Sequence, residues 1–167
     1  LTAVFDRVLA ANLAQPRVYV HRDFMPRNLM VSEPNPGVLD FQDALHGPVS
    51  YDIACLYRDA YLSWEEDVVL DGTIRYWDLA REKGLPVPAD FADFWRDVEW
   101  MGLQRHLKVA GIFARLHHRD GKAGYVEDTP RFIAYMHRTC ARYRELAPLA
   151  RLLERVEGVE ARPGYTF

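Results

Sequence analysis

The pattern of apolar and polar residues changes near position 50, from one helix and short strands to a series of helices. Before this position, apolar residues three and four positions apart predict a helix over residues 1–13, which Pro16 would end. Short apolar, β-branched stretches then predict strands over 17–20 and 29–31. The turn-forming residues 33–37 predict a hairpin from the second of these strands into the apolar residues that follow.

Beyond that point the apolar residues follow a helical period. Five helices are expected: one from Tyr51, one over 65–83, one from Asp90 to about Arg119, one from Thr129-Pro130 and one over 148–156. Loops are expected over 42–50 and 120–128. No repeat or linker divides the chain, so residues 1–158 are expected to form one lobe, followed by a tail over 159–167. The expected fold class is α+β and mostly helical, with a small β-hairpin region.

A polar loop between the two predicted strands combines the side chains that phosphoryl transfer requires. Asp23 ends a His-Arg-Asp tripeptide, Asn28 follows five positions later, and Asp40 begins an Asp-Phe dipeptide twelve positions after that. This spacing fits the H-R-D-x-x-x-x-N and D-F pattern of kinases. The tripeptide, the asparagine and the Asp-Phe dipeptide together, at this spacing, are a much more specific signal than any one of them alone.

Each residue type has a chemical reason in this pattern. Asp23 is the candidate catalytic base, because a carboxylate can orient the attacking hydroxyl and accept its proton. Asn28 and Asp40 are the candidate ligands of Mg²⁺, which prefers hard oxygen donors and would bind together with ATP. His21 is expected to support the loop by bonding nearby backbone, not to act as a base.

Asp52 has two compatible interpretations. It falls in the first turn of the helix expected from Tyr51, where a carboxylate is favoured by unpaired amides and by the helix dipole. Alternatively, it reaches back and supports the backbone of the catalytic loop.

Composition narrows the possible partners. The 49% apolar and 13% aromatic content indicates a globular fold, and the net charge of -3 gives no sign of nucleic-acid binding. No apolar run approaches the roughly 20 residues of a membrane helix, and no signal peptide is recognisable, so a cytoplasmic protein is expected. Cys55 and Cys140 lack metal-ligand spacing and are expected to be buried free thiols.

Neither a glycine-rich phosphate loop nor a strand lysine precedes the catalytic loop, although kinase sites use both to hold ATP. The chain is therefore expected to be the C-terminal part of a longer protein. The N-terminal lobe of that protein would supply the missing nucleotide contacts, and this chain alone is expected to be inactive.

At these motifs the sequence resembles the C-terminal lobe of the aminoglycoside phosphotransferase-like kinases, relatives of the protein-kinase fold. It more closely resembles the bacterial kinases that phosphorylate the anomeric hydroxyl of N-acetylmuramate and N-acetylglucosamine in cell-wall recycling. The resemblance is carried by residues 20–24, 27–30, 39–44, 47–48, 51–54, 103–109, 111–116 and 120–122. It implies that Asp23 is the base, that Asn28 and Asp40 bind Mg²⁺, and that Asp52 supports the loop.

The sequence departs from the protein kinases at three points. Gln42 follows Asp-Phe where they have glycine, and Met25 stands where serine/threonine kinases carry a lysine. Ten residues separate Phe41 from Asp52, too few for an activation segment. A small-molecule acceptor is therefore expected.

Charge gives an argument about that acceptor. Five cations and one acid lie between Met101 and Val126, which favours a carboxylate-bearing sugar over a polycationic aminoglycoside. Arg105, His106 and Lys108 are candidate substrate contacts, although a solvated helix face would explain the same residues. Two other functions stay open: an aminoglycoside or other antibiotic phosphotransferase, and an isolated lobe that binds substrate without catalysis.

Overall fold

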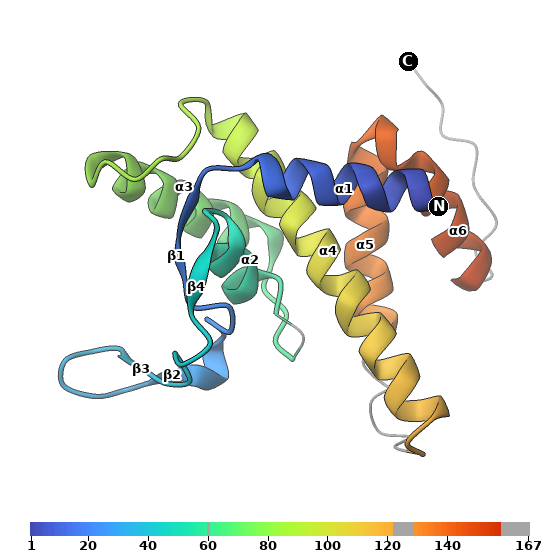
Figure 1. The fold of residues 1–167 in the computed structure, drawn as a ribbon, viewed down its shortest axis with the longest axis horizontal. Helices are drawn as coiled ribbons and strands as arrows, with labels where there is room; N and C mark the ends of the chain where they lie inside the picture. Colours follow the sequence, from blue (N-terminus) through green and yellow to red (C-terminus); the bar gives the residue numbers. More distant parts are fainter. Residues whose placement is uncertain (60, 122–128, 158–167) are drawn as a thin grey trace. The chain divides into compact units, whose positions relative to one another are not determined.

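Helices make up most of the computed structural model, which describes residues 1–59, 61–121 and 129–157 (Figure 1). The elements are α1 (Thr2–Ala14), β1 (Arg17–Val20), η1 (Pro26–Asn28), β2 (Leu29–Met30), β3 (Gly37–Val38), β4 (Leu45–Pro48), α2 (Tyr51–Tyr57), α3 (Glu66–Glu82), α4 (Phe91–His118), α5 (Thr129–Arg142), η3 (Arg144–Leu146) and α6 (Ala147–Glu157). The expectation of a mostly helical chain with small β-elements is confirmed.

The chain forms two compact units. One comprises residues 8–105, and the other joins residues 1–7 to the part of the chain from residue 106 onward. The loop predicted to carry the chemistry lies wholly within the first unit. The single lobe expected over residues 1–158 stays a prediction, and the tail over 159–167 lies outside the described residues.

Strand β4 corrects one expectation, because residues 42–50 were expected to form a loop. Strands β1 and β4 pair antiparallel, from Arg17 opposite Pro48 to Val20 opposite Leu45. The pairing requires a close approach at Gly47, where a Cβ atom would lie 2.8 Å from Cγ2 of Val20. Periodicity could not reveal so short a strand, since it forms only by pairing with a segment far away in the chain.

The predicted hairpin is confirmed in β2 and β3. Leu29 pairs with Val38 and Met30 with Gly37 in antiparallel register. One further hydrogen bond, from the Leu39 amide to the Asn28 carbonyl at 3.0 Å, extends the pairing toward the predicted catalytic loop. The connection between the two strands projects away from β1 and β4 (Figure 1).

The apolar core of the unit 8–105 forms where α2 packs on α4. Its buried residues are Val49, Ile53, Ala54, Phe94, Val98 and Met101. A buried polar network lies beside this core, in which Ser50 Oγ donates to Gln15 Oε1 at 2.6 Å and Gln15 Nε2 donates to Asn12 Oδ1 at 3.3 Å. Asn12 Nδ2 in turn donates to the Trp100 carbonyl. These bonds fix the end of α1 and the start of α2 against α4.

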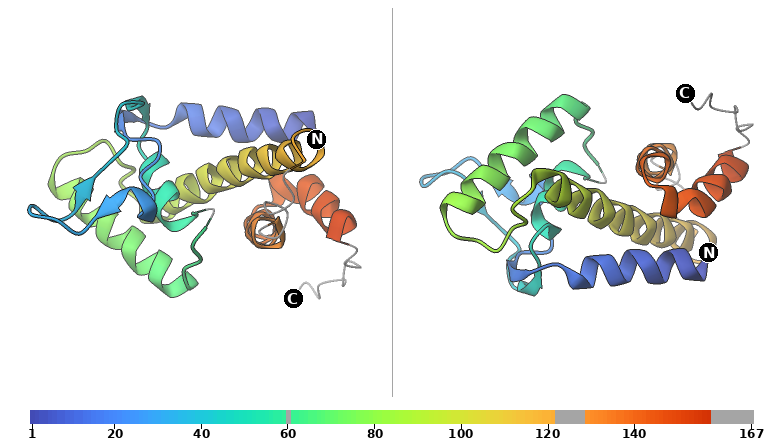
Figure 2. Two further views of the ribbon diagram at one scale, coloured as in Figure 1. Left: turned by 90° about the horizontal axis from the view of Figure 1, so that it is seen from below. Right: turned by 90° about the horizontal axis from the view of Figure 1, so that it is seen from above.

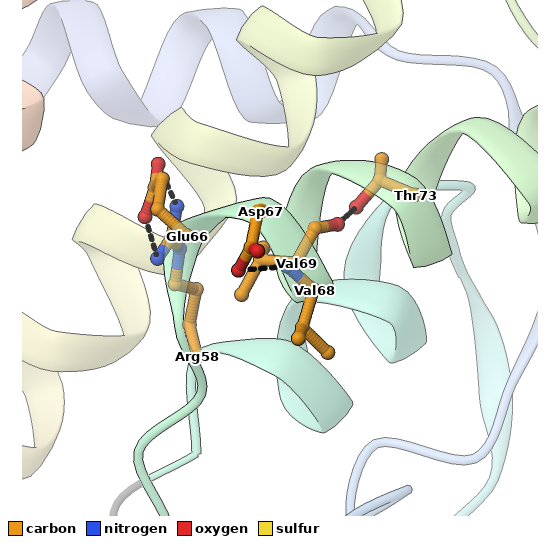
Figure 3. Close-up of polar contacts among 6 residues, drawn as sticks. All are labelled: Arg58, Glu66, Asp67, Val68, Val69 and Thr73. Atoms are coloured by element: carbon orange, nitrogen blue, oxygen red, sulfur yellow. Dashed lines mark hydrogen bonds and ion pairs between the residues drawn. The ribbon is translucent and has the colours of Figure 1, made fainter.

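Helix α3 is held to the end of α2 by an ion pair with two hydrogen bonds. Arg58 is buried and bonds the Glu66 carboxylate at 3.0 and 3.1 Å (Figure 3). The neighbouring Asp67 accepts a hydrogen bond from the Val68 amide at 2.8 Å at the start of α3 (Figure 3). Since the arginine is removed from water, losing its partner would leave a buried unpaired charge.

The second unit is built on α5 and α6, which lie side by side (Figures 1 and 2). The buried side chains of α5 are Phe132, Tyr135, Met136, Thr139 and Cys140. Leu149 and Leu153 of α6 are buried as well, and His137 contacts Glu154 at 3.2 Å. No helix of the described residues is long and apolar enough to cross a membrane.

Candidate active site

The catalytic-loop sequence begins where β1 ends. Arg22 has a φ of 78° and Asp40 a φ of 66°, left-handed values that are uncommon for residues other than glycine. Such conformations persist where the surrounding contacts determine them, and they often lie at functional sites. The contacts that hold this loop therefore determine the conformations of Arg22 and Asp40.

Asp52 holds the start of the loop through both of its carboxylate oxygens. The His21 amide donates to Oδ2 at 2.7 Å and the Arg22 amide to Oδ1 at 3.0 Å. Asp52 also lies in the first turn of α2. These bonds match the interpretation in which Asp52 reaches back to the loop backbone, while only its position in the first turn agrees with the helix-start interpretation. Charge-assisted bonds of this kind are stronger than neutral ones.

Two side chains donate to the Arg22 carbonyl. Cys55 Sγ donates to it at 3.1 Å, and Arg105 Nη1 donates to it at 3.3 Å. Burial raises the pKa of the Cys55 thiol to about 12, with smaller contributions from the Asp52 and Asp23 carboxylates against the opposing effect of Arg105. The thiol therefore stays protonated at neutral pH and remains a donor.

The amide of Asn28 connects the two ends of the loop. Its Nδ2 donates to the Asp23 backbone carbonyl at 2.9 Å, and Asn28 is the last residue of the 3₁₀ turn η1. The same carbonyl accepts the Met25 amide at 2.9 Å. With the nitrogen of Asn28 committed to the loop, its carbonyl oxygen is the part of the side chain that remains to bind a cation.

His21 joins the loop to the segment that carries Asp40. Its Nε2 lies 2.9 Å from the Leu39 carbonyl, and its Nδ1 accepts the Asp23 amide at 3.3 Å. Since the Leu39 amide bonds the Asn28 carbonyl, Leu39 contacts both halves of the motif, and Asp40 follows it directly. One hydrogen-bonded network thus includes Asp23, Asn28 and the residue before Asp40.

Gln42, which replaces the glycine of protein kinases, contacts the second carboxylate. Its Nε2 donates to Asp40 Oδ1 at 2.6 Å. Asp40 is exposed, and its other carboxylate oxygen makes no contact among the described residues. The glutamine therefore orients the carboxylate and leaves an oxygen for a ligand.

The donor set fits Mg²⁺, which takes oxygen ligands and is usually held by one or two carboxylates together with substrate phosphates. An amide oxygen and a carboxylate oxygen are what Asn28 and Asp40 offer. In the described part of the chain, no group of three or more histidine, cysteine, aspartate or glutamate side chains could hold a metal by itself. Cys55 and Cys140 are buried free thiols, as expected.

The three candidate substrate contacts have different surroundings. Arg105 bonds the Arg22 carbonyl and lies with its guanidinium 5.1 Å from the centre of the Tyr51 ring, so it supports the loop. His106 is 2% exposed and stacks on Tyr135 at 5.1 Å, which argues against a substrate contact, so its assignment to substrate binding stays an untested prediction. Lys108 is exposed, and its role stays a prediction.

Reading the sequence did not predict two contacts that hold the loop, those of Cys55 and Arg105 to the Arg22 carbonyl. Each residue is more than thirty positions from Arg22 in the chain. Cys55 falls in the helical turn after Asp52, and this spacing of three places both residues on one helix face. The spacing of Asp52 and Cys55 could have indicated the contact of Cys55, whereas nothing in the sequence indicated the contact of Arg105 to this carbonyl.

Comparison with known proteins assigns the family. The model of the phosphotransferase enzyme family matches residues 1–89, more than half of the chain and including the whole loop. The chain therefore belongs to the phosphotransferase enzyme family.

Three relatives with the same name extend the comparison. The N-acetylmuramate/N-acetylglucosamine kinase of Neisseria meningitidis serogroup B is 60% identical over 163 residues, which are 97% of this chain and 49% of the relative. That of Pseudomonas aeruginosa is 57% identical, covering 95% of this chain and 47% of the relative. That of Caulobacter vibrioides is 30% identical over 96% of this chain and 44% of the relative. The chain spans about half the length of the curated relatives it matches.

Proposed function

We propose that this chain is the C-terminal catalytic lobe of a small-molecule kinase. In the complete protein, the kinase would transfer the γ-phosphate of ATP to the anomeric hydroxyl of N-acetylmuramate or N-acetylglucosamine, in recycling of the cell wall. The observation that carries the proposal is the network in which Asp52, Asn28 and His21 together fix the backbone around Asp23. The names of relatives that align over nearly the whole chain support the choice of acceptor.

Asp23 acts as the base in this proposal. Its carboxylate orients the acceptor hydroxyl and takes its proton as the hydroxyl oxygen bonds to the γ-phosphorus and the bond to the β–γ bridging oxygen breaks, releasing ADP. The contacts of Asp52 and Asn28 fix the backbone that carries this carboxylate before substrate arrives, which reduces the cost of positioning it in the transition state.

Asn28 and Asp40 hold Mg²⁺ through their oxygen atoms. The ion would neutralise charge that develops on the phosphates. The bond from Asn28 Nδ2 would orient the amide oxygen of the same side chain, and Gln42 Nε2 would orient Asp40. A change at Gln42 is therefore expected to alter metal affinity without removing a ligand.

The remaining nucleotide contacts are proposed to come from a second lobe. Residues 1–158 would be the catalytic lobe, residues 159–167 a tail, and the segment that the longer relatives have in addition would include the ATP-binding lobe. Exposed apolar side chains flank the catalytic loop, namely Tyr19, Met30, Val31, Leu39, Phe41 and Leu45, as expected of a surface that another lobe covers. The reaction is assigned to the cytoplasm, where ATP is available.

A panel of acceptors tests the proposal. The complete protein is incubated with γ-labelled ATP, Mg²⁺ and N-acetylmuramate, N-acetylglucosamine or kanamycin, and labelled product is measured. We expect label in the two sugars and little in kanamycin. Preference for kanamycin would replace the sugar kinase with an antibiotic phosphotransferase. Transfer to none of the three, with a folded protein, would support binding without catalysis.

A further inference from the structure

Arg27 is an exposed cation next to the proposed metal ligand Asn28. Its guanidinium carbon lies 3.9 Å from the centre of the Tyr61 ring. Within the described residues, its nitrogen atoms have no hydrogen bond or ion pair. An arginine stacked on an aromatic ring keeps its N–H donors in the plane of the guanidinium, where they can still bind a ligand edge-on.

The other arginines around the loop are occupied by the protein itself. Arg22 Nη1 donates to the Asp43 carbonyl at 3.2 Å, Arg105 donates to the Arg22 carbonyl, and Arg58 pairs with Glu66. Each of these cations therefore has a structural partner. Arg27 differs from them because, in the part of the chain that the structure describes, it makes only the ring contact.

The backbone that carries the Tyr61 ring is held by hydrogen bonds. Asp59 is 4% exposed, and its Oδ2 accepts the amides of Tyr61 at 3.2 Å and Leu62 at 3.0 Å. A second bond, from Trp64 Nε1 to the Leu56 carbonyl at 3.2 Å, holds the chain just beyond. The stacking contact on a ring whose backbone is held reduces the side-chain entropy that Arg27 would lose on binding a ligand.

We propose that Arg27 binds the carboxylate of an acidic acceptor sugar and so sets the preference between the two acceptors. The inference rests on the proposed function, since it assigns a part of that site. N-acetylmuramate differs from N-acetylglucosamine by an ether-linked lactyl group that carries a carboxylate. The planar fork of an arginine matches a carboxylate with two parallel N–H···O bonds. This role replaces the one first expected of Arg105 and His106, whose side chains are engaged elsewhere.

A phosphate oxygen of the nucleotide has similar chemistry, so the test must separate the two sources. Arg27→Gln in the complete protein removes the charge, and Arg27→Lys keeps it without the fork. The matched control is Arg81→Gln, since Arg81 is also an exposed arginine stacked on a ring, with its guanidinium carbon 4.6 Å from the centre of the Trp77 ring. The KM and kcat are measured for N-acetylmuramate, N-acetylglucosamine and ATP.

We expect Arg27→Gln to raise the KM for N-acetylmuramate about tenfold, the size expected for an exposed charge-assisted pair. The KM values for N-acetylglucosamine and ATP should stay within about twofold, Arg27→Lys should recover part of the loss, and Arg81→Gln should match the wild type. An equal rise for both sugars, a rise for ATP, or no change for N-acetylmuramate would each overturn the inference. A wild-type protein that phosphorylates neither sugar would instead refute the proposed function.

Discussion

The side-chain amide of Asn28 donates a hydrogen bond to the backbone carbonyl of Asp23 at 2.9 Å, which joins the proposed metal ligand to the proposed base. Because this bond uses the nitrogen of the amide, it selects the orientation in which the oxygen is left for a cation. The position of the loop at Asp23 and the proposed binding of the metal therefore depend on the same side chain.

Replacing Asn28 with alanine tests that coupling. We expect kcat to fall about 100-fold and the Mg²⁺ concentration needed for half-maximal rate to rise, since both a ligand and a loop contact are lost. Asn35→Ala is the control, as Asn35 is exposed in the connection between β2 and β3. An Asn28→Ala enzyme with the wild-type Mg²⁺ dependence would show that Asn28 does not bind the metal.

The two cysteines should be unreactive in the folded protein. Burial raises the thiol pKa of both Cys55 and Cys140 to about 12, so at pH 8 about one thiol in ten thousand is ionised. Since the unperturbed value is 9.0, their stabilising contribution is complete below pH 9 and is lost as pH rises toward 12. Mass spectrometry after iodoacetamide treatment should find labelling only with denaturant. Rapid labelling of Cys55 in the native protein would contradict its contact with the Arg22 carbonyl.

Asp97 should make stability depend on pH in the mildly acidic range. Burial, and to a smaller extent the Asp93 carboxylate, raise its pKa from 3.8 to about 6 against the opposing effect of Arg96. A raised pKa means that the folded state binds the proton more tightly, so the contribution is complete below pH 3.8 and is lost as pH rises through 6.

Asp97→Asn removes this titration. Between pH 4 and pH 7, the wild type should lose about 1 kcal/mol of unfolding free energy relative to Asp97→Asn, a value reduced for partial solvent exposure. Urea titrations at the two pH values measure it, and Asp71→Asn, at an exposed position of α3, is the control. Parallel pH profiles of wild type and Asp97→Asn would refute the assignment.

The close approach of α2 and α3 at Gly72 gives a stability test. A Cβ atom there would overlap the Tyr57 phenol, whose ring also packs edge-on against Trp64. Gly72→Ala is therefore expected to lower the unfolding free energy by about 1 kcal/mol, since the clash outweighs the gain in helix propensity.

Gly111→Ala is the matched control for that change. Gly111 lies in α4, and among the described residues nothing is within 4 Å of a Cβ atom placed there. Its replacement should raise the unfolding free energy by about 0.5–1 kcal/mol. Denaturant unfolding of both variants measures the difference, and a stabilised Gly72→Ala would mean that the two helices can separate at little cost.

The sequence predicted the local features of this chain well. Strand 17–20, the hairpin that follows it and the main helices all depend on periodicity and turn residues, which are local signals. In α4, the helical spacing of apolar residues agrees with the burial of Phe94, Val98 and Met101. In α1 only some of the apolar residues are buried: Val4 and Val8 are buried, whereas Phe5 and Leu9 are 43% and 51% exposed.

What the sequence could not predict depends on contacts between distant segments. Strand β4 exists because it pairs with β1, and the loop carbonyl of Arg22 is bonded by an arginine 83 positions away. The basic character of residues after Met101 suggested substrate binding for Arg105, but charge alone does not distinguish a ligand contact from a bond to backbone. Helical periodicity likewise could not show that His106 stacks on Tyr135.

The most direct test of the account is the single-turnover rate of phosphate transfer by the complete protein with saturating Mg²⁺·ATP and N-acetylmuramate. Asp23→Asn keeps the size of the side chain and removes the base, so the rate should fall about 10²–10⁴-fold while nucleotide affinity stays within about twofold. Asp67→Asn, at the exposed start of α3, should behave as the wild type. An Asp23→Asn enzyme that transfers phosphate at the wild-type rate would contradict the central claim that this carboxylate is the catalytic base.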